Sequence, residues 1–447
     1  MKRCLTGAVG VCCVAACVSP ALAQTSTGSG RPFGGLFGAR SERTGGHNLE
    51  LTATLVQAYD DNLLAESGGI SAGTNLVGGQ YSMLQAGTQY KWAGRSVQLG
   101  INGSSAFRYY GQVGDVQTVS HAAAAGLSAT LARRTSVLIN QSVAYSPSYL
   151  FGLFPAVSGP EPGATQPTAP DYAVNDLASY SYVTSAAVSH GLTRRVSLAA
   201  SANYTFTDFS REENGRRDVT AYGASTDLAR GIGRHTDLRV GYRYRTGGFG
   251  STGSASTTEH ALDVGMNHRK ILSASRQAHF GFGLGMSATN TPDDISPTGQ
   301  PGPIVSPGQL YRVVGNATVG YEFARSWQAR AAYRQGLEYV ADLTEPVFVG
   351  GFTATVDGLL TRRADLQASA GYSSGKSALS EVTTFDTFTA SLRSRLALTR
   401  AAAVYLEYLY FFYEFSGSPL LVGGSSPRLE RHGLRGGLTL WVPAFRR

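Results

Sequence analysis

Cysteine is almost absent from this 447-residue chain, with four residues that all lie within the first 17 positions: Cys4, Cys12, Cys13 and Cys17. The rest of the chain therefore has no disulfide framework and no thiolate metal site. Charged residues make up only 15% of the sequence. After residue 24, no apolar run reaches the roughly 18 to 20 residues that a membrane-spanning helix requires. These absences exclude a disulfide-stabilised scaffold and a helical membrane protein.

Sequence motifs for catalysis and phosphate binding are missing as well. The eight histidines show no H-E-x-x-H spacing, and neither a G-x-S-x-G elbow nor a G-x-x-x-x-G-K loop occurs. The acidic pairs Asp60/Asp61 and Asp293/Asp294 are adjacent in sequence, and neighbouring side chains of an extended chain point in opposite directions. We therefore expect no enzyme activity, no cofactor, no metal and no nucleic-acid partner.

The first residues have the composition of a targeting segment. Lys2 and Arg3 precede an apolar run, and Ala21-Leu-Ala23 forms a small-x-small cleavage site. We expect a signal peptide over 1–23, a Gly/Ser/Thr-rich flexible leader over 24–46, and one further domain over 47–447. An alternative is that Val14-Ala-Ala-Cys17 is a lipoprotein cleavage box, which would leave Cys17 acylated.

A short arginine-containing phrase recurs between alternating apolar and polar runs. Its copies are Leu131-Ala-Arg-Arg134, Leu192-Thr-Arg-Arg195, Leu360-Thr-Arg-Arg363 and Leu398-Thr-Arg400. Two alternating strands joined by two or three polar residues form a tight antiparallel hairpin. The connections between these hairpins are longer and rich in Gly, Pro, Ser and Asp. Short turns alternating with long loops are typical of an outer-membrane β-barrel.

Eighteen strand candidates follow along the chain, and 16 is the alternative count. They cover 48–59, 81–92, 96–110, 119–132, 135–147, 176–190, 194–208, 217–230, 235–247, 257–270, 276–289, 310–324, 327–340, 349–361, 365–375, 383–398, 401–415 and 428–445. An even number places both termini on the periplasmic side. The sequence therefore predicts an all-β transmembrane antiparallel barrel.

Alternation divides each strand into a lipid face and a wet face. In 237–245, leucine, valine and tyrosine occupy one face, and Leu238 is expected to contact lipid near the middle of its strand. The arginines expected to line the pore are Arg108, Arg239, Arg243, Arg245, Arg312, Arg330, Arg334, Arg393, Arg395, Arg431 and Arg435. Arginine rings inside a pore favour anions. The competing interpretation is that these side chains pair with lumen acids such as Glu338 and only solvate the wall.

Aromatic residues and the C-terminal strand agree with a barrel. Trp92, Trp327 and Trp441 fall at the predicted periplasmic strand ends, and Tyr408–Tyr413 at an opposite end, as in two interfacial belts. Residues 435–445 resemble the C-terminal signal that the barrel assembly machinery reads; Arg435, Gly437, Leu440 and Val442 match it. The departure is that Arg446 and Arg447 follow the final aromatic residue.

The end of the first strand carries a short acidic motif, Tyr59-Asp60-Asp61-Asn62. It resembles the β-barrel porins of the second type, outer-membrane barrels associated with exopolysaccharide production and export. The resemblance implies a barrel of this size that works with a polysaccharide export system. Three interpretations of the motif remain: a plain turn, a contact with a partner or glycan, and a calcium site.

Two proline-rich stretches, 148–175 and 290–309, are expected to be loops, either lids or inward-folded constrictions. The working hypothesis is a channel of the Gram-negative outer membrane that exports an anionic polysaccharide. Its partners would be membrane lipid, the polysaccharide and a periplasmic export protein. The alternative is a general or anion-selective porin for small-solute uptake, and a plugged structural or adhesive barrel is the third hypothesis.

Overall fold

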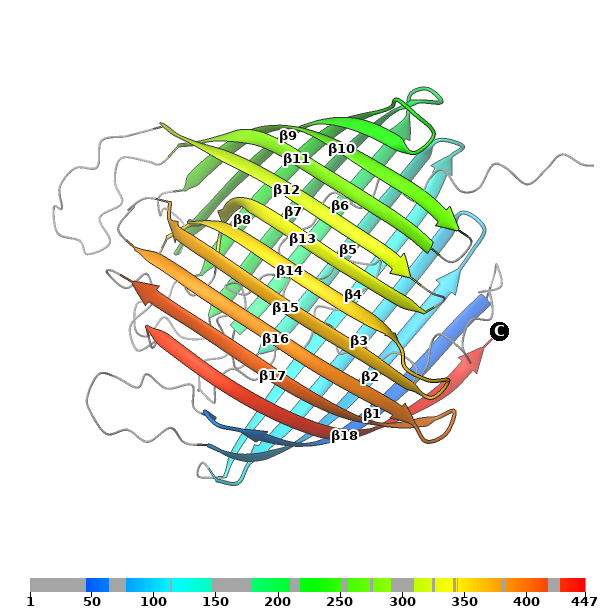
Figure 1. The fold of residues 1–447 in the computed structure, drawn as a ribbon, viewed down its shortest axis with the longest axis vertical. Coiled ribbons are helices and arrows are strands. Elements are labelled where there is room, and N and C mark those ends of the chain that lie inside the picture. Colours follow the sequence, from blue (N-terminus) through cyan, green and yellow to red (C-terminus); the bar gives the residue numbers. More distant parts are fainter. Residues whose placement is uncertain are drawn as a thin grey trace, which may run out of the picture.

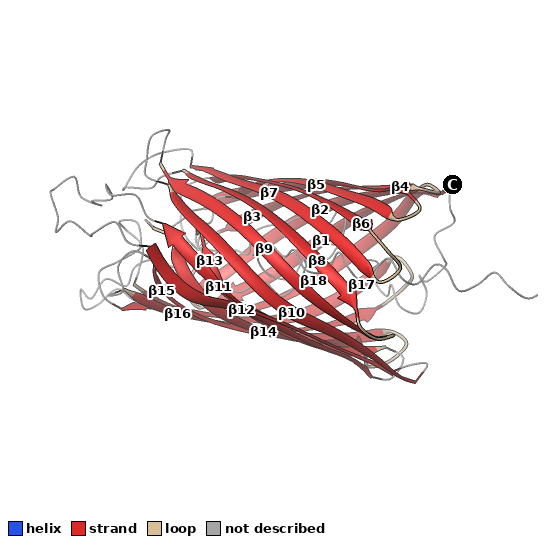
Figure 2. Cartoon of the chain, turned by 90° about the horizontal axis from the view of Figure 1, so that it is seen from above, coloured by secondary structure: helices blue, strands red, loops and turns tan. Residues whose placement is uncertain are grey.

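The computed structural model describes residues 46–63, 78–112, 115–146, 179–209, 218–250, 256–273, 276–290, 309–323, 326–340, 343, 345–378, 383–416 and 427–446. The predicted signal peptide, the leader up to residue 45 and nearly all of the two proline-rich stretches lie outside these residues. Within the described part, every regular element is a β-strand (Figure 2).

Eighteen strands form in the described part of the chain. They are β1 (Gly46–Asp60), β2 (Gly79–Ala93), β3 (Val97–Tyr110), β4 (Val116–Ala132), β5 (Thr135–Ser146), β6 (Ser179–Gly191), β7 (Val196–Phe209), β8 (Val219–Gly231), β9 (Thr236–Phe249), β10 (Thr257–Ser273), β11 (Arg276–Asn290), β12 (Gln309–Phe323), β13 (Trp327–Glu338), β14 (Val347–Leu359), β15 (Ala364–Ser377), β16 (Thr384–Ala397), β17 (Ala402–Ser416) and β18 (Arg428–Arg446). Each begins and ends within three residues of its predicted bounds.

Every strand pairs antiparallel with its neighbours in the sequence, and β1 also pairs with β18. The sheet therefore closes on itself. It is an 18-stranded antiparallel barrel. The strands are tilted, so near and far walls cross in projection, and β18 ends on the side of the short turns (Figure 1). Closure removes the exposed strand edges that an open sheet would leave for pairing with other chains.

The outer face of the barrel is apolar. Large side chains at alternate positions are exposed along the strands, including Leu55 (60%), Leu284 (62%) and Val264 (58%). Such a surface is unfavourable in water and suits contact with lipid. Among the described residues, no helix is long and apolar enough to span a membrane.

The loss of unfolding free energy caused by a charged side chain on this face depends on its depth in the membrane. Leu238 faces outward as predicted, but it is the third residue of β9 and lies near a short turn, so its expected mid-strand position is wrong. Leu284, midway along β11, is the better mid-membrane site. We expect Leu284→Arg to lower the unfolding free energy by about 2 to 4 kcal/mol and Leu238→Arg by less than about 1 kcal/mol. Urea unfolding in liposomes measures both, and equal costs would contradict this depth assignment.

Candidate functional site in the barrel lumen

The structure places all eleven predicted arginines on the face opposite the apolar one, which is the lumen. Arg108 and Arg431 are almost fully buried there, with 3% and 2% exposure. The arginines occupy two arcs of the wall, one on β9, β12 and β13 and the other on β16, β18 and β3. Whether they control permeation is a prediction that the geometry alone does not test.

The wall between these arcs is uncharged over β5, β6 and β7. Lumen-facing serines pair across strands there, with hydroxyl distances of 2.7 Å for Ser136–Ser189 and 2.8 Å for Ser201–Ser225. Small hydroxyl side chains leave the lumen wide on this side. A solute in the lumen would therefore meet guanidinium groups on two sides and hydroxyl groups on a third.

Several arginines are paired with lumen acids, as the competing sequence interpretation expected. Arg239 contacts Asp227 at 3.3 Å and Asp263 at 2.8 Å, and Arg395 contacts Asp365 at 2.5 Å. The structure adds Asp227 and Asp365 to the lumen acids expected from the sequence. These pairs neutralise part of the positive wall.

Glycine makes room for one of these clusters. On the lumen face of β9, Gly241 lies between Arg239 and Arg243, and a Cβ atom at this position would be 2.7 Å from both the Asp227 and Asp263 carboxylates. Any larger residue would have to displace the acids that hold Arg239.

Three further lumen arginines make cation–π or amide contacts. Arg393 lies over the Tyr405 ring at 4.8 Å, Arg435 over Tyr81 at 6.0 Å, and Arg330 donates to Gln328 at 2.8 Å.

The end of β13 separates from β12, stays paired with β14 up to Glu338–Val347, and contacts the lumen face of β9. Its pairing with β12 stops at Gly315–Gln335, although β13 continues to Glu338. Beyond that point the chain makes contacts with β9 and β10, which lie four and three strands away along the wall. Such contacts are possible only across the inner face of the barrel. We refer to the described residues of this segment, 337–340, 343 and 345–348, as the lumen strap.

Polar contacts hold one side of the lumen strap against β9 and β10. Arg245 of β9 donates to the Leu337 carbonyl and contacts Glu338 at 3.4 Å. The Tyr339 hydroxyl donates to the Thr257 carbonyl at 2.8 Å. Burial raises the pKa of the Tyr339 phenol well above its usual range, so that it stays protonated and able to donate.

A glycine of β9 leaves space for the contact between the lumen strap and this wall. A Cβ atom at Gly247 of β9 would lie 2.7 Å from the Tyr339 ring, so glycine leaves space for this ring to lie on the wall. Next to it, Phe348 belongs to a buried cluster with Ala261 and Val314, and the Arg312 guanidinium lies 5.0 Å from the Phe348 ring centre.

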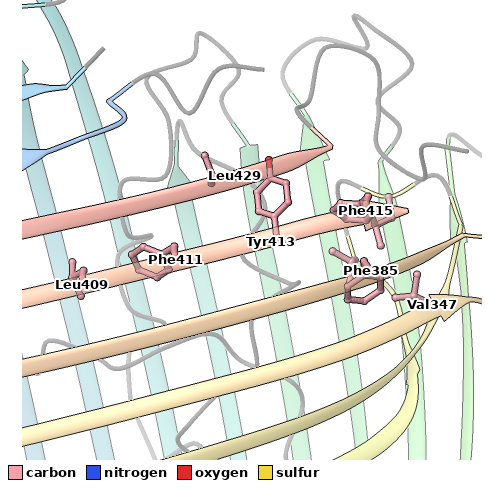
Figure 3. Close-up of a cluster of buried hydrophobic side chains, with 9 residues drawn as sticks. Val347, Phe385, Leu409, Phe411, Tyr413, Phe415 and Leu429 are labelled. Atoms are coloured by element: carbon pink, nitrogen blue, oxygen red, sulfur yellow. The ribbon is translucent and has the colours of Figure 1, made fainter. Parts of the chain in front are cut away.

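Apolar contacts hold the other side of the lumen strap. Val340 and Leu343 belong to a buried cluster with residues from β14, β16, β17 and β18. The other members are Val347, Phe385, Leu409, Phe411, Tyr413, Phe415 and Leu429, which gather in one patch (Figure 3). The described residues of the lumen strap therefore contact two parts of the wall, β9 and β10 on one side and β16 to β18 on the other.

Two sequence interpretations of aromatic residues need correction. Phe411 and Tyr413 are on the lumen face, so only Tyr408, Tyr410 and Phe412 of that run face outward. Trp441 also faces inward, because its indole donates to lumen-facing Glu50 at 3.2 Å. Alternation predicts strands but cannot decide which aromatic residues meet lipid once part of the lumen is packed.

The Tyr59–Asn62 motif lies at the junction of the first and last strands. Arg431 of β18 donates from Nε to both Asp60 oxygens, at 2.7 and 2.6 Å. The Asp61 carboxylate accepts the His432 backbone N–H at 2.7 Å, and the Asn62 N–H donates to Asp60 at 3.0 Å. Tyr59 points outward and is 51% exposed.

These contacts extend the turn interpretation of the motif and oppose the calcium interpretation. Both carboxylates already accept hydrogen bonds from β18, so they are not arranged around a common ion. In the described part of the chain, no group of three or more His, Cys, Asp or Glu residues could hold a metal. The motif joins β1 to β18.

Comparison with solved structures finds similarity at low sequence identity and low TM-score. OccK11 (OpdR) of Pseudomonas aeruginosa is 12% identical over 91% of this chain and 99% of its own, with a TM-score of 0.42. OccAB4 of Acinetobacter baumannii is 10% identical over 90% and 98%, with a TM-score of 0.40. A bacterial polysaccharide outer membrane secretin is 11% identical over 87% and 97%, with a TM-score of 0.30.

No family model matches the sequence, and no curated protein matches it either. The resemblance of Tyr59–Asn62 to the β-barrel porins of the second type therefore stays a prediction. The features of this chain that bear on function are the lumen arginines and the lumen strap.

Proposed function

We propose that this protein is a channel of the bacterial outer membrane through which small anionic solutes diffuse inward. The closed barrel with an apolar outer face supports a membrane location. The arginine-rich lumen favours anions. The proposal requires no chemistry on the chain.

The observation that carries the proposal is the lumen strap. Its described residues contact the wall at Arg245 and the apolar patch around Phe411, so side chains and backbone of this segment lie inside the barrel at this level. An 18-stranded barrel without such an element would leave a wide aqueous channel. A narrowed lumen suits small solutes, whereas an extended polysaccharide would have to displace the strap. The uptake alternative is therefore favoured over the export hypothesis.

Ion selectivity tests this function. We expect the refolded barrel to conduct in a planar bilayer with a preference for anions, and Arg243→Glu combined with Arg334→Glu to shift the preference towards cations. The matched control, Arg133→Glu with Arg194→Glu, makes the same charge change at exposed turn positions and should leave selectivity nearly unchanged. The reversal potential in a salt gradient measures all three proteins. A wild-type channel without anion preference would contradict the proposal.

A further inference from the structure

Arginines at the start of the lumen strap already contact a side-chain carboxylate, that of Glu338. Arg334 contacts Glu338 at 2.7 Å, and Arg245 contacts the other oxygen of Glu338 at 3.4 Å. Arg243 lies two residues from Arg245 on the same lumen face and interacts electrostatically with both Glu338 and Arg334. Two guanidinium groups therefore contact one side-chain carboxylate, and a third lies close enough to interact with it electrostatically.

This cluster has unused capacity to bind an anion. The Arg243 Nε is buried and has no hydrogen-bond partner among the described residues. Glu259 lies opposite Arg245 in the strand register, so the cluster holds three positive and two negative groups. Neither Glu259 oxygen has a hydrogen-bond partner in the described part of the chain. A buried donor without a partner is costly, and a guanidinium fork suits the two oxygens of a carboxylate.

We propose that Arg243, Arg245 and Arg334 form a binding site for carboxylate-bearing solutes, in which the Glu338 carboxylate occupies the place of the solute between binding events. This inference rests on the proposed channel function and adds a substrate class to it. Glu338 acts as a built-in competitor: it keeps the arginines ordered and, because it must be displaced or shared, it keeps solute affinity low. Low affinity allows a solute to leave the site quickly, which conduction requires.

The location of the site supports a role in permeation. Glu338 is the last residue of β13. The next residue, Tyr339, donates a hydrogen bond to the Thr257 carbonyl of β10. A solute that binds Arg334 competes with the contact that fixes the root of the strap. Solute binding and the position of the strap are therefore coupled at the same arginines.

Succinate block of the chloride current tests the site, with each variant first checked for a folded, conducting barrel. In wild type we expect a weak, rapid block. Glu338→Gln should tighten the block by about tenfold, because it removes the competing charge and leaves the three arginines in place. In the Glu338→Gln background, Arg243→Gln should reverse most of this gain.

The control variant is Glu322→Gln. It removes a lumen carboxylate that lies beside the start of β13, whereas Glu338 lies at the end of β13, so it should leave the succinate block within about twofold of wild type. Ethane-1,2-disulfonate, a dianion of similar length, should block Glu338→Gln less tightly than succinate does. Equal tightening in Glu338→Gln and Glu322→Gln would overturn the site, and equal block by the disulfonate would overturn its preference for carboxylates.

If Glu338→Gln does not fold, a second variant tests the same site. Arg243 interacts with Glu338 electrostatically, whereas Arg245 and Arg334 make the ion pairs with it, so Arg243→Gln alone should preserve those ion pairs and weaken the wild-type succinate block by about tenfold. An unchanged block would overturn the proposal. Failure of the channel function would appear earlier, as a wild-type barrel without anion-selective current before any succinate is added.

Discussion

Replacing Arg245 with alanine should raise the single-channel conductance roughly twofold and add rapid current fluctuations, because the narrowest section of a pore controls its conductance. Arg245 both donates to the Leu337 carbonyl and contacts Glu338, so its loss frees the root of the lumen strap from β9. The strap would then remain attached mainly through Tyr339 and its apolar patch. Single-channel recording in a planar bilayer measures both effects.

Arg330→Ala is the matched control for this experiment. It removes one lumen arginine as well, but Arg330 is exposed to the lumen and its hydrogen bond goes to Gln328, far from the strap. Both variants therefore lose the same charge, and only one loses an attachment of the strap. Identical conductance changes in the two variants would mean that charge alone, and not the position of the strap, controls the current.

Asp60→Asn should destabilise the barrel by about 3 to 5 kcal/mol, because it leaves the buried Arg431 guanidinium without its counter-charge. The two side chains are only 4% and 2% exposed, and their closest ion-pair contact is 2.5 Å. Urea unfolding followed by tryptophan fluorescence measures the loss. Exchanging the two residues, Asp60→Arg with Arg431→Asp, should recover part of the stability.

An exposed ion pair between β17 and β18 provides the comparison. Arg428 and Glu414 are 4.0 Å apart and 60% and 49% exposed, so Glu414→Gln should cost less than about 1 kcal/mol. If Asp60→Asn cost no more than Glu414→Gln, the Asp60–Arg431 contact would not contribute measurably to barrel closure.

The strands could be predicted from the sequence because a barrel wall separates lipid from water at every second residue. This alternation is visible in segments such as Leu238–Arg245, and it places the arginines of β9 on the lumen face without any knowledge of tertiary contacts. The arginine-containing turns then fix where each strand ends. Local pattern was sufficient for the whole wall.

The lumen strap could not be predicted in this way, because it depends on contacts between distant strands. Proline content predicted lids or constrictions at 148–175 and 290–309. The segment that contacts the lumen face of β9 instead begins at Leu337, at the end of a regular strand. One signal was available: Tyr408–Tyr413 is apolar on both faces, which indicates a strand that is covered on both sides. The run was assigned to an interfacial belt instead.

The ion pair between Asp60 and Arg431 also has a consequence for the order of folding. The two residues are 371 positions apart, so the pair can form only after nearly the entire chain has been synthesised. Contacts of such long sequence separation carry the loop-closure entropy of all intervening segments and form slowly. Until then β1 has only β2 beside it, and β18 only β17. We therefore expect the pairing of Asp60 with Arg431 to be a late step of barrel folding, which a truncated chain that lacks β18 cannot reach.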